Sequence, residues 1–178
     1  MHVSFRSAVL CSLLSVASLA IAQSSPVSSS VADPHSTEEW ALIAPHLPNP
    51  VTDSPGKLET AADVLRARRF PQDALTFYKA AMINGGDRSR LLKKQGVVHL
   101  EMQHGLLARL YFQQALKVNK RDAEAWNNLG AADFMLGNSH SAVGEYKHAV
   151  KLDRDSAIFH SNLALAYFET RDAADARK

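Results

Sequence analysis

A set of small residues recurs in this chain at a fixed interval of 34 residues. Two columns of alanines and one of aromatic residues keep this interval, and a further column holds only alanine or glycine. The columns are Ala74, Ala108, Ala142 and Ala176; Ala81, Ala115 and Ala149; Tyr78, Phe112 and Tyr146; and Ala62, Gly96, Gly130 and Ala164. Such an interval indicates structural repeats that bury their apolar faces against one another.

The third repeat carries the most complete pattern. Its tryptophan, leucine, small and aromatic positions are Trp126, Leu129, Gly130, Ala142, Tyr146 and Ala149. This spacing resembles the tetratricopeptide repeat (TPR), whose signature is W-x2-L-G-x2-Y, then A-x3-F, then P. The resemblance covers about residues 55–178, with departures at Asp133 and at His99 one unit earlier, where an aromatic residue is usual, and at Arg154 in place of the proline.

The resemblance implies an all-α fold, a right-handed α-solenoid of antiparallel helix pairs with about three and a half repeats. The units lie near 55–88, 89–122, 123–156 and 157–178, the last of them incomplete. Caps and helix breakers predict helices at 57–68, 71–84, 89–102, 106–118, 122–136, 139–152 and 155–170.

In the fourth unit we expect a second helix that starts at Asp172 and just reaches Ala176. Solenoids normally end in a polar capping helix that shields the last apolar face. Two interpretations stay open: the uncapped repeat pairs with another molecule, which would give self-association, or the sequence is the front part of a longer array.

The first 22 residues have the pattern of a secretory signal peptide. Arg6 supplies a short basic region, an apolar run covers residues 8–22, and residues 20–22 have the A-x-A cleavage pattern before Gln23. The run is short for a membrane-spanning helix, which needs about 20 apolar residues. We therefore expect an exported protein, periplasmic or secreted, of a bacterial envelope. An uncleaved signal that acts as an anchor is the only membrane contact we expect.

Residues 23–54 are predicted to be a Ser/Pro-rich linker, because six of the seven prolines precede Gly56. A short helix is expected at 36–44, where Ser36 and Glu39 form a capping box. This helix either covers the open end of the first repeat or lies in the binding groove as a ligand-like segment.

Composition argues against several functions. The one cysteine, Cys11, is lost with the signal peptide, so no thiolate metal ligand remains. The full chain has 20 basic and 18 acidic residues, and loss of Arg6 with the signal peptide leaves 19 basic and 18 acidic residues. This nearly neutral balance gives no general attraction to nucleic acid. The basic run Arg66, Arg68 and Arg69 is interpreted as a solvated helix end. No zinc-protease, C-x-x-C or G-x-S-x-G motif is present, so we expect no catalysis, metal or cofactor.

His99 and Asp133 lie one interval apart. They could meet between stacked units as a hydrogen-bonded pair, or they could merely replace aromatic packing.

In TPR proteins, the first helix of each unit lines a concave surface that receives a peptide or a partner helix. The resemblance implies that Glu59 and Asp63 face this surface from the first unit and Val97 from the second. The residues nominated for partner binding are Lys93, Lys94, Asn127, Asn128, Phe134, Met135, Asn162 and Phe168.

Asn128 and Asn162 are one interval apart and could clamp the backbone of an extended peptide, with Lys94 adding a cationic contact. The alternative is that both amides are merely solvated or bonded to a neighbouring helix. Chaperone-binding relatives hold their ligand with a carboxylate clamp of five residues. This chain matches the clamp at two of the five positions, with Lys93 and Asn128. Val97, Ile158 and Asn162 occupy the other three, so we do not expect recognition of an EEVD-like tail.

These features predict a non-catalytic adaptor or scaffold that binds a protein or peptide partner in the concave groove. The alternative is the N-terminal docking part of a longer TPR protein or enzyme.

Overall fold

The computed structural model describes residues 33–175, with side chains up to residue 171. The regular structure in this range is entirely helical, as the all-α expectation requires. All described helices belong to one compact unit that begins at Pro34. The predicted signal peptide, the serine-rich part of the linker and Ala176 lie outside the described residues.

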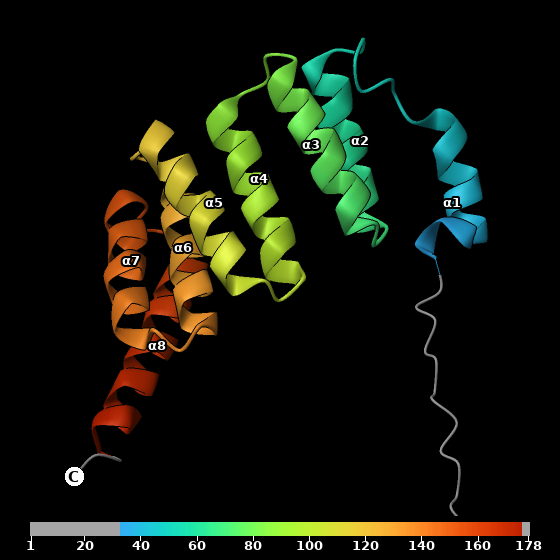
Figure 1. Cartoon of the computed structure of the whole chain (residues 1–178). Helices are drawn as coiled ribbons and strands as arrows, with labels where there is room; N and C mark the ends of the chain where they lie inside the picture. Colours follow the sequence, from blue (N-terminus) through green and yellow to red (C-terminus); the bar gives the residue numbers. More distant parts are fainter. Residues whose placement is uncertain (1–32, 176–178) are drawn as a thin grey trace, which may run out of the picture. The chain divides into compact units, whose positions relative to one another are not determined.

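Three helix pairs and a longer final helix make up the repeat array (Figure 1). Each helix from α2 onward packs against the next one along the chain. The helices are α2 (Pro55–Ala67), α3 (Pro71–Ile83), α4 (Arg88–Glu101), α5 (Gly105–Val118), α6 (Ala123–Met135), α7 (Ser139–Leu152) and α8 (Ala157–Asp175). Before them, α1 (Glu38–Ile43) lies between two short 3-10 turns, η1 (Pro34–Ser36) and η2 (Ala44–His46).

The recurring small and aromatic residues form the core of each helix pair. The six described alanines of the two alanine columns are fully buried. A Cβ atom placed on Gly96 would lie 2.6 Å from the ring of Phe112, and one on Gly130 would lie 2.8 Å from Tyr146. Because both rings are buried and cannot swing away, these positions exclude any side chain. The aromatic ring of the second helix thus packs on the small residue of the first helix in the same unit.

Two positions after the first helix of each complete unit comes a residue with positive φ, and these residues are 34 apart: Arg69 (66°), Gln103 (61°) and Gly137 (77°). In each case the next backbone N–H donates to the carbonyl five residues earlier, as in a Schellman turn. The fourth residue of this series, Arg171, lies inside α8, which continues to Asp175.

The predicted break after residue 170, with a new helix from Asp172, is therefore wrong. A left-handed arginine costs about 1–2 kcal/mol, and in the complete units packing of the following helix offsets this cost. Ala164, which corresponds to Gly96 and Gly130, is exposed in α8 because no second helix of its unit lies against it in the described range.

Helix α1 packs on the first repeat. Trp40 and Ile43 pack against the apolar core of the first repeat, and the ring of Trp40 lies 5.1 Å from that of Phe70. Arg68 donates to Glu39 at 3.0 Å. This arrangement agrees with the interpretation that the helix covers the end of the first repeat. Its N-cap is Thr37, whose hydroxyl accepts from the Trp40 N–H, rather than the predicted Ser36.

None of the helices within 33–175 is both long and apolar enough to cross a membrane.

Candidate functional site

The nominated binding residues lie on the first helices of the units. Lys93 and Lys94 are on α4, while Asn162 and Phe168 are on α8. The remaining four are on α6: Asn127, Asn128, Phe134 and Met135. The side chains of the α2–α4 half and of the α6–α8 half differ sharply in how far they are already paired.

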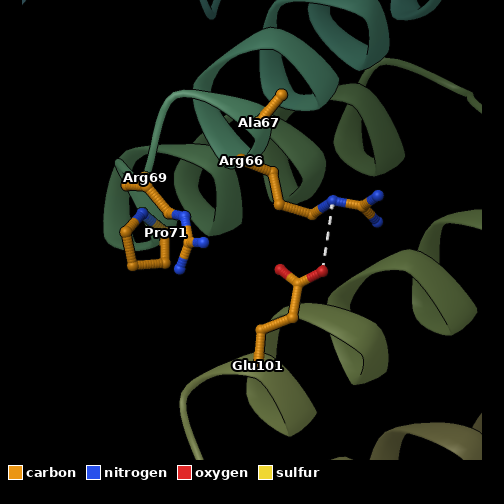
Figure 2. A pocket seen from close by; sticks show the side chains of 5 residues that line it. All are labelled: Arg66, Ala67, Arg69, Pro71 and Glu101. Carbon is orange, nitrogen blue, oxygen red and sulfur yellow. Dashed lines mark ion pairs between the residues drawn. The ribbon is translucent and has the colours of Figure 1, made fainter.

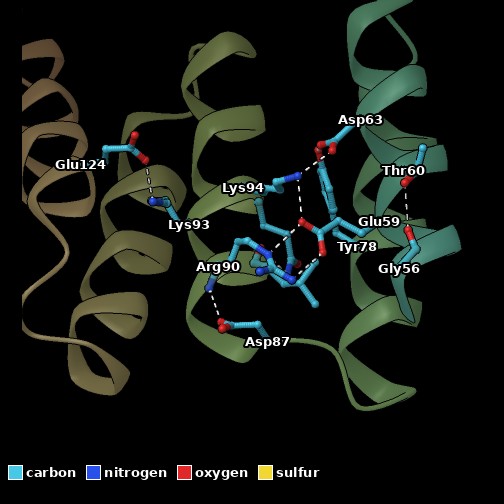
Figure 3. A network of polar contacts seen from close by, with 12 residues as sticks. Gly56, Glu59, Thr60, Asp63, Tyr78, Asp87, Arg90, Lys93, Lys94 and Glu124 are labelled. Atoms are coloured by element: carbon cyan, nitrogen blue, oxygen red, sulfur yellow. Dashed lines mark hydrogen bonds and ion pairs between the residues drawn. The ribbon is translucent and has the colours of Figure 1, made fainter. Parts of the chain in front are cut away.

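Between α2 and α4 the charged side chains satisfy one another (Figure 3). Arg90 donates to both carboxylate oxygens of Glu59, at 3.0 and 3.1 Å. The Lys94 ammonium lies 2.9 Å from Glu59 and 2.6 Å from Asp63. The hydroxyl of Tyr78 donates to Asp63 as well, and burial together with this bond raises the pKa of Tyr78. Lys94 is therefore held inside a network and does not project a free charge.

Lys93 is held in the same way on the other side of α4. Its ammonium lies 3.0 Å from Asp122, which caps α6, and 2.6 Å from Glu124. Partial burial alone would lower the pKa of Lys93, but the hydrogen bonds to the two carboxylates outweigh it and the pKa is raised. Both nominated lysines thus tie neighbouring units together, because their carboxylate partners lie 29–35 positions away in the sequence.

The three nominated asparagines form a hydrogen-bonded row across α6 and α8. Asn162 Nδ2 donates to Asn127 Oδ1 at 2.8 Å, and Asn127 Nδ2 donates to Asn128 Oδ1 at 3.4 Å. This row, hereafter the amide row, leaves a donor on Asn128 and an acceptor on Asn162 without a partner among the described residues. Reversing all three amides would exchange these two ends but would still leave one donor and one acceptor.

Apolar side chains accompany the amide row. Phe168 is 62% exposed, and Met135, Ile158 and Leu165 are also exposed. Phe134 differs from them, because it is half-buried and packs against the core of the third repeat. The open part of the nominated surface therefore combines amides with apolar groups on α6 and α8.

Of the two interpretations of His99 and Asp133, the hydrogen-bonded pair between stacked units is wrong. Asp133 is fully buried, accepts from Asn138 at 2.9 Å and lies 3.4 Å from the Arg109 guanidinium. His99 instead stacks on Tyr111 at 5.0 Å, and burial lowers its pKa.

Glu145 is the member of this cluster that sequence reasoning missed. Burial, the charge of Asp133 and a hydrogen bond with Asp133 raise its pKa to about 8. A signal for this contact was present: Tyr111 and Glu145 share one column of the repeat, and His99 and Asp133 share another. The two columns meet within a unit. The second unit has the ring contact between His99 and Tyr111 at this place, and the third unit has the acid pair of Asp133 and Glu145.

The basic run at the end of α2 offers little free charge. Arg68 is paired with Glu39, and Arg66 points toward Glu101 with 3.8 Å between their charged atoms (Figure 2). Arg69 lines the same cavity of about 520 Å³. A carboxylate in the wall makes this cavity a poor site for phosphate. The described residues also contain no group of three or more acidic, histidine or cysteine side chains suited to a metal ion.

No model of a known protein family matches the chain, and no curated protein matches it. Solved TPR domains do match its fold. The first TPR of Spaghetti (RPAP3), bound to the HSP90 peptide SRMEEVD, gives a TM-score of 0.64 at 15% identity, covering 68% of this chain and 98% of that one. The Sgt2 TPR domain from Aspergillus fumigatus gives 0.66 at 18% identity, covering 72% and 86%.

MamA gives a TM-score of 0.60 at 17% identity, covering 65% of this chain and 68% of that one. At such identities the likeness concerns the fold. It confirms the predicted tetratricopeptide-repeat fold for the helices of this chain.

Proposed function

We propose that this protein is a non-catalytic adaptor that holds a peptide or partner helix against the surface formed by α6 and α8. The amide row carries this proposal, because it offers one free donor and one free acceptor, the two groups that an extended peptide backbone needs. Exposed apolar side chains beside it, Phe168 among them, would receive apolar side chains of the ligand. Similarly folded domains bind peptides: the RPAP3 domains were solved with an HSP90 peptide and an HSP70 peptide.

The ligand that this surface suits differs from the acidic tails in those two structures. Lys93 and Lys94 are each bound to two carboxylates of the protein itself. An EEVD-like tail would have to displace these pairs before it gained an ion pair of its own. We therefore assign the site a ligand with apolar side chains and a free backbone rather than a carboxylate-rich tail.

The proposed setting is the periplasm or the secreted space of a bacterial envelope. Support comes from the signal-like pattern of residues 1–22. We expect the exported protein to begin at Gln23 and to lack Cys11, which an intact-mass measurement would establish. Recovery of a membrane-bound form that retains Met1 would favour an anchored protein instead.

Replacing both ends of the amide row is expected to weaken ligand binding. Peptides would be selected from a displayed random library on the chain from Gln23 to Lys178, and their affinities would be measured by fluorescence anisotropy. Each lost hydrogen bond is worth about 0.5–1.5 kcal/mol. The double variant Asn128→Ala, Asn162→Ala should then bind about 5-fold to 150-fold more weakly.

A matched control is Gln113→Ala, which removes an exposed amide on α5. It should leave both affinity and helicity unchanged. If the double variant kept its helicity and bound every selected peptide as tightly as the parent, the amide row would have no role in binding. The apolar strip of Met135 and Phe168 would then be the surface to test.

A further inference from the structure

A second groove lies away from the amide row, between α3 and α5. Both helices pack against α4 (Figure 1). Side chains of α4, Leu92 and Gln95 among them, line the groove. The groove encloses about 380 Å³, within the range of about 300–1,000 Å³ typical of ligand pockets. Its walls are largely apolar: Ile83, from α3, is 82% exposed, and Leu107 and Leu110 from α5 are also exposed. An exposed apolar wall of this kind marks an interaction site rather than a packing surface.

The floor of the groove holds a buried acceptor without a donor. Gln95 is completely buried, and its Nε2 donates to the Leu91 carbonyl at 3.3 Å. Gln95 lines the groove, and its Oε1 has no hydrogen-bond partner in the described part of the chain. A buried oxygen that has lost water without gaining a donor is unfavourable, so a ligand that brought a donor to it would remove that cost.

The rim of the groove is positively charged. Arg88 is the first residue of α4, and Lys79 lies one turn before Ile83 on α3. No ion pair is formed by either side chain within the described residues, whereas Arg90, Lys93 and Lys94 on the other side of α4 are all paired with carboxylates. The rim is thus complementary to an acidic ligand.

We propose that this groove docks an acidic, apolar peptide segment of a partner protein. Two or three apolar side chains of the segment fill the groove, a hydroxyl or N–H between them donates to Gln95 Oε1, and flanking carboxylates pair with Lys79 and Arg88. The groove is open to solvent, which favours a segment that remains part of a larger protein over an enclosed small molecule. The site is separate from the amide row, so one chain could hold two partners.

The test uses the same displayed peptide library on the chain from Gln23 to Lys178. Selected peptides are compared on a groove variant, Lys79→Glu with Arg88→Glu, and on the amide-row variant, Asn128→Ala with Asn162→Ala. We expect a class of peptides with carboxylates flanking apolar residues whose affinity falls at least about 10-fold on the groove variant alone. Lys117→Glu with Lys151→Glu makes the same charge change at exposed positions and should alter their affinity by less than about 2-fold.

Gln95→Leu separates binding from structure. A merely structural amide would lose stability on replacement, whereas removal of an unpaired buried oxygen should leave the melting temperature unchanged or higher. Affinity for the same peptides should fall about 3-fold to 10-fold. In methyl NMR spectra, these peptides should shift the signals of Ile83, Leu107 and Leu110.

The proposal is overturned if the library yields no peptide sensitive to the groove variant. It is equally overturned if every selected peptide loses binding on the amide-row variant, since that result would place all binding on α6 and α8. Failure of the amide-row variant to affect any peptide would contradict the proposed function while leaving the groove intact.

Discussion

Replacing Arg109 by methionine is expected to lower the free energy of unfolding by about 3 kcal/mol. The guanidinium is the cation next to Asp133, which is fully buried, and next to Glu145, whose Oε2 is buried as well. Removing it leaves a buried negative charge without a counterion. Breaking buried ion pairs costs about 3–5 kcal/mol, and we expect the lower end because the Arg109 side chain is 39% exposed. Chemical denaturation would measure the change.

Two further variants show whether the loss comes from the charge. Arg109→Met combined with Asp133→Leu removes both charges, so much of the lost stability should return. Arg121→Met removes an exposed arginine that has no ion pair within the described region, and should change stability by less than about 0.5 kcal/mol. If Arg109→Met and Arg121→Met had equal effects, the guanidinium would contribute nothing to the cluster.

The repeating fold could be predicted from sequence because its packing is local and periodic. Gly96 and Phe112 are in contact within one unit, and Gly130 and Tyr146 repeat that contact one interval later. A column of small residues opposite a column of rings therefore predicts the helix pair directly. The end of α8 was not predictable in this way, because the turn at Arg69 and Gln103 has no local sequence preference and depends on the helix that follows it.

The pairing within the candidate site was only partly visible in the sequence. The positions of Lys94 and Asn128 on the first helices follow from the interval. That Lys94 is bound to Glu59 and Asp63 depends on the rotation of α2 relative to α4, which the interval does not fix. Neighbouring columns should therefore be compared for opposite charges before a lysine is assigned to a ligand.

The acid pair is a second case. Asp133 departs visibly from the repeat pattern, but the interval suggests a partner only one unit away, at His99. The contact instead joins two columns within a unit, and Arg109 approaches from α5. Buried charged clusters of this kind replace an apolar contact at one unit only, so periodicity does not reveal them.

The same cluster is expected to make stability depend on pH. Asp133 Oδ2 and Glu145 Oε2 are both buried and lack a fixed hydrogen-bond donor. Burial is the main reason why the pKa of Glu145 is raised from 4.5 to about 8, and the charge of Asp133 and a hydrogen bond with Asp133 add to the rise. At neutral pH the folded protein therefore holds a proton that the unfolded chain releases.

The sign follows from this difference. A folded-state pKa above the unfolded value contributes stability that is fully present below the unfolded value of 4.5 and is lost as pH rises through the folded value of about 8. Between these limits, the contribution of Glu145 to the free energy of unfolding should fall with rising pH by at most about 1.4 kcal/mol per pH unit.

Glu145→Gln tests this directly. A glutamine amide can still donate to Asp133 but does not titrate. The melting temperature of the variant should therefore fall less steeply than that of the parent between about pH 5 and about pH 8. His99 acts in the opposite direction, because its lowered pKa removes stability as pH falls, but both proteins carry it and the difference between their slopes isolates residue 145. Parallel pH profiles would mean that Glu145 holds no extra proton in the folded protein at neutral pH, and Arg109 would then be left as the group that balances the two acids.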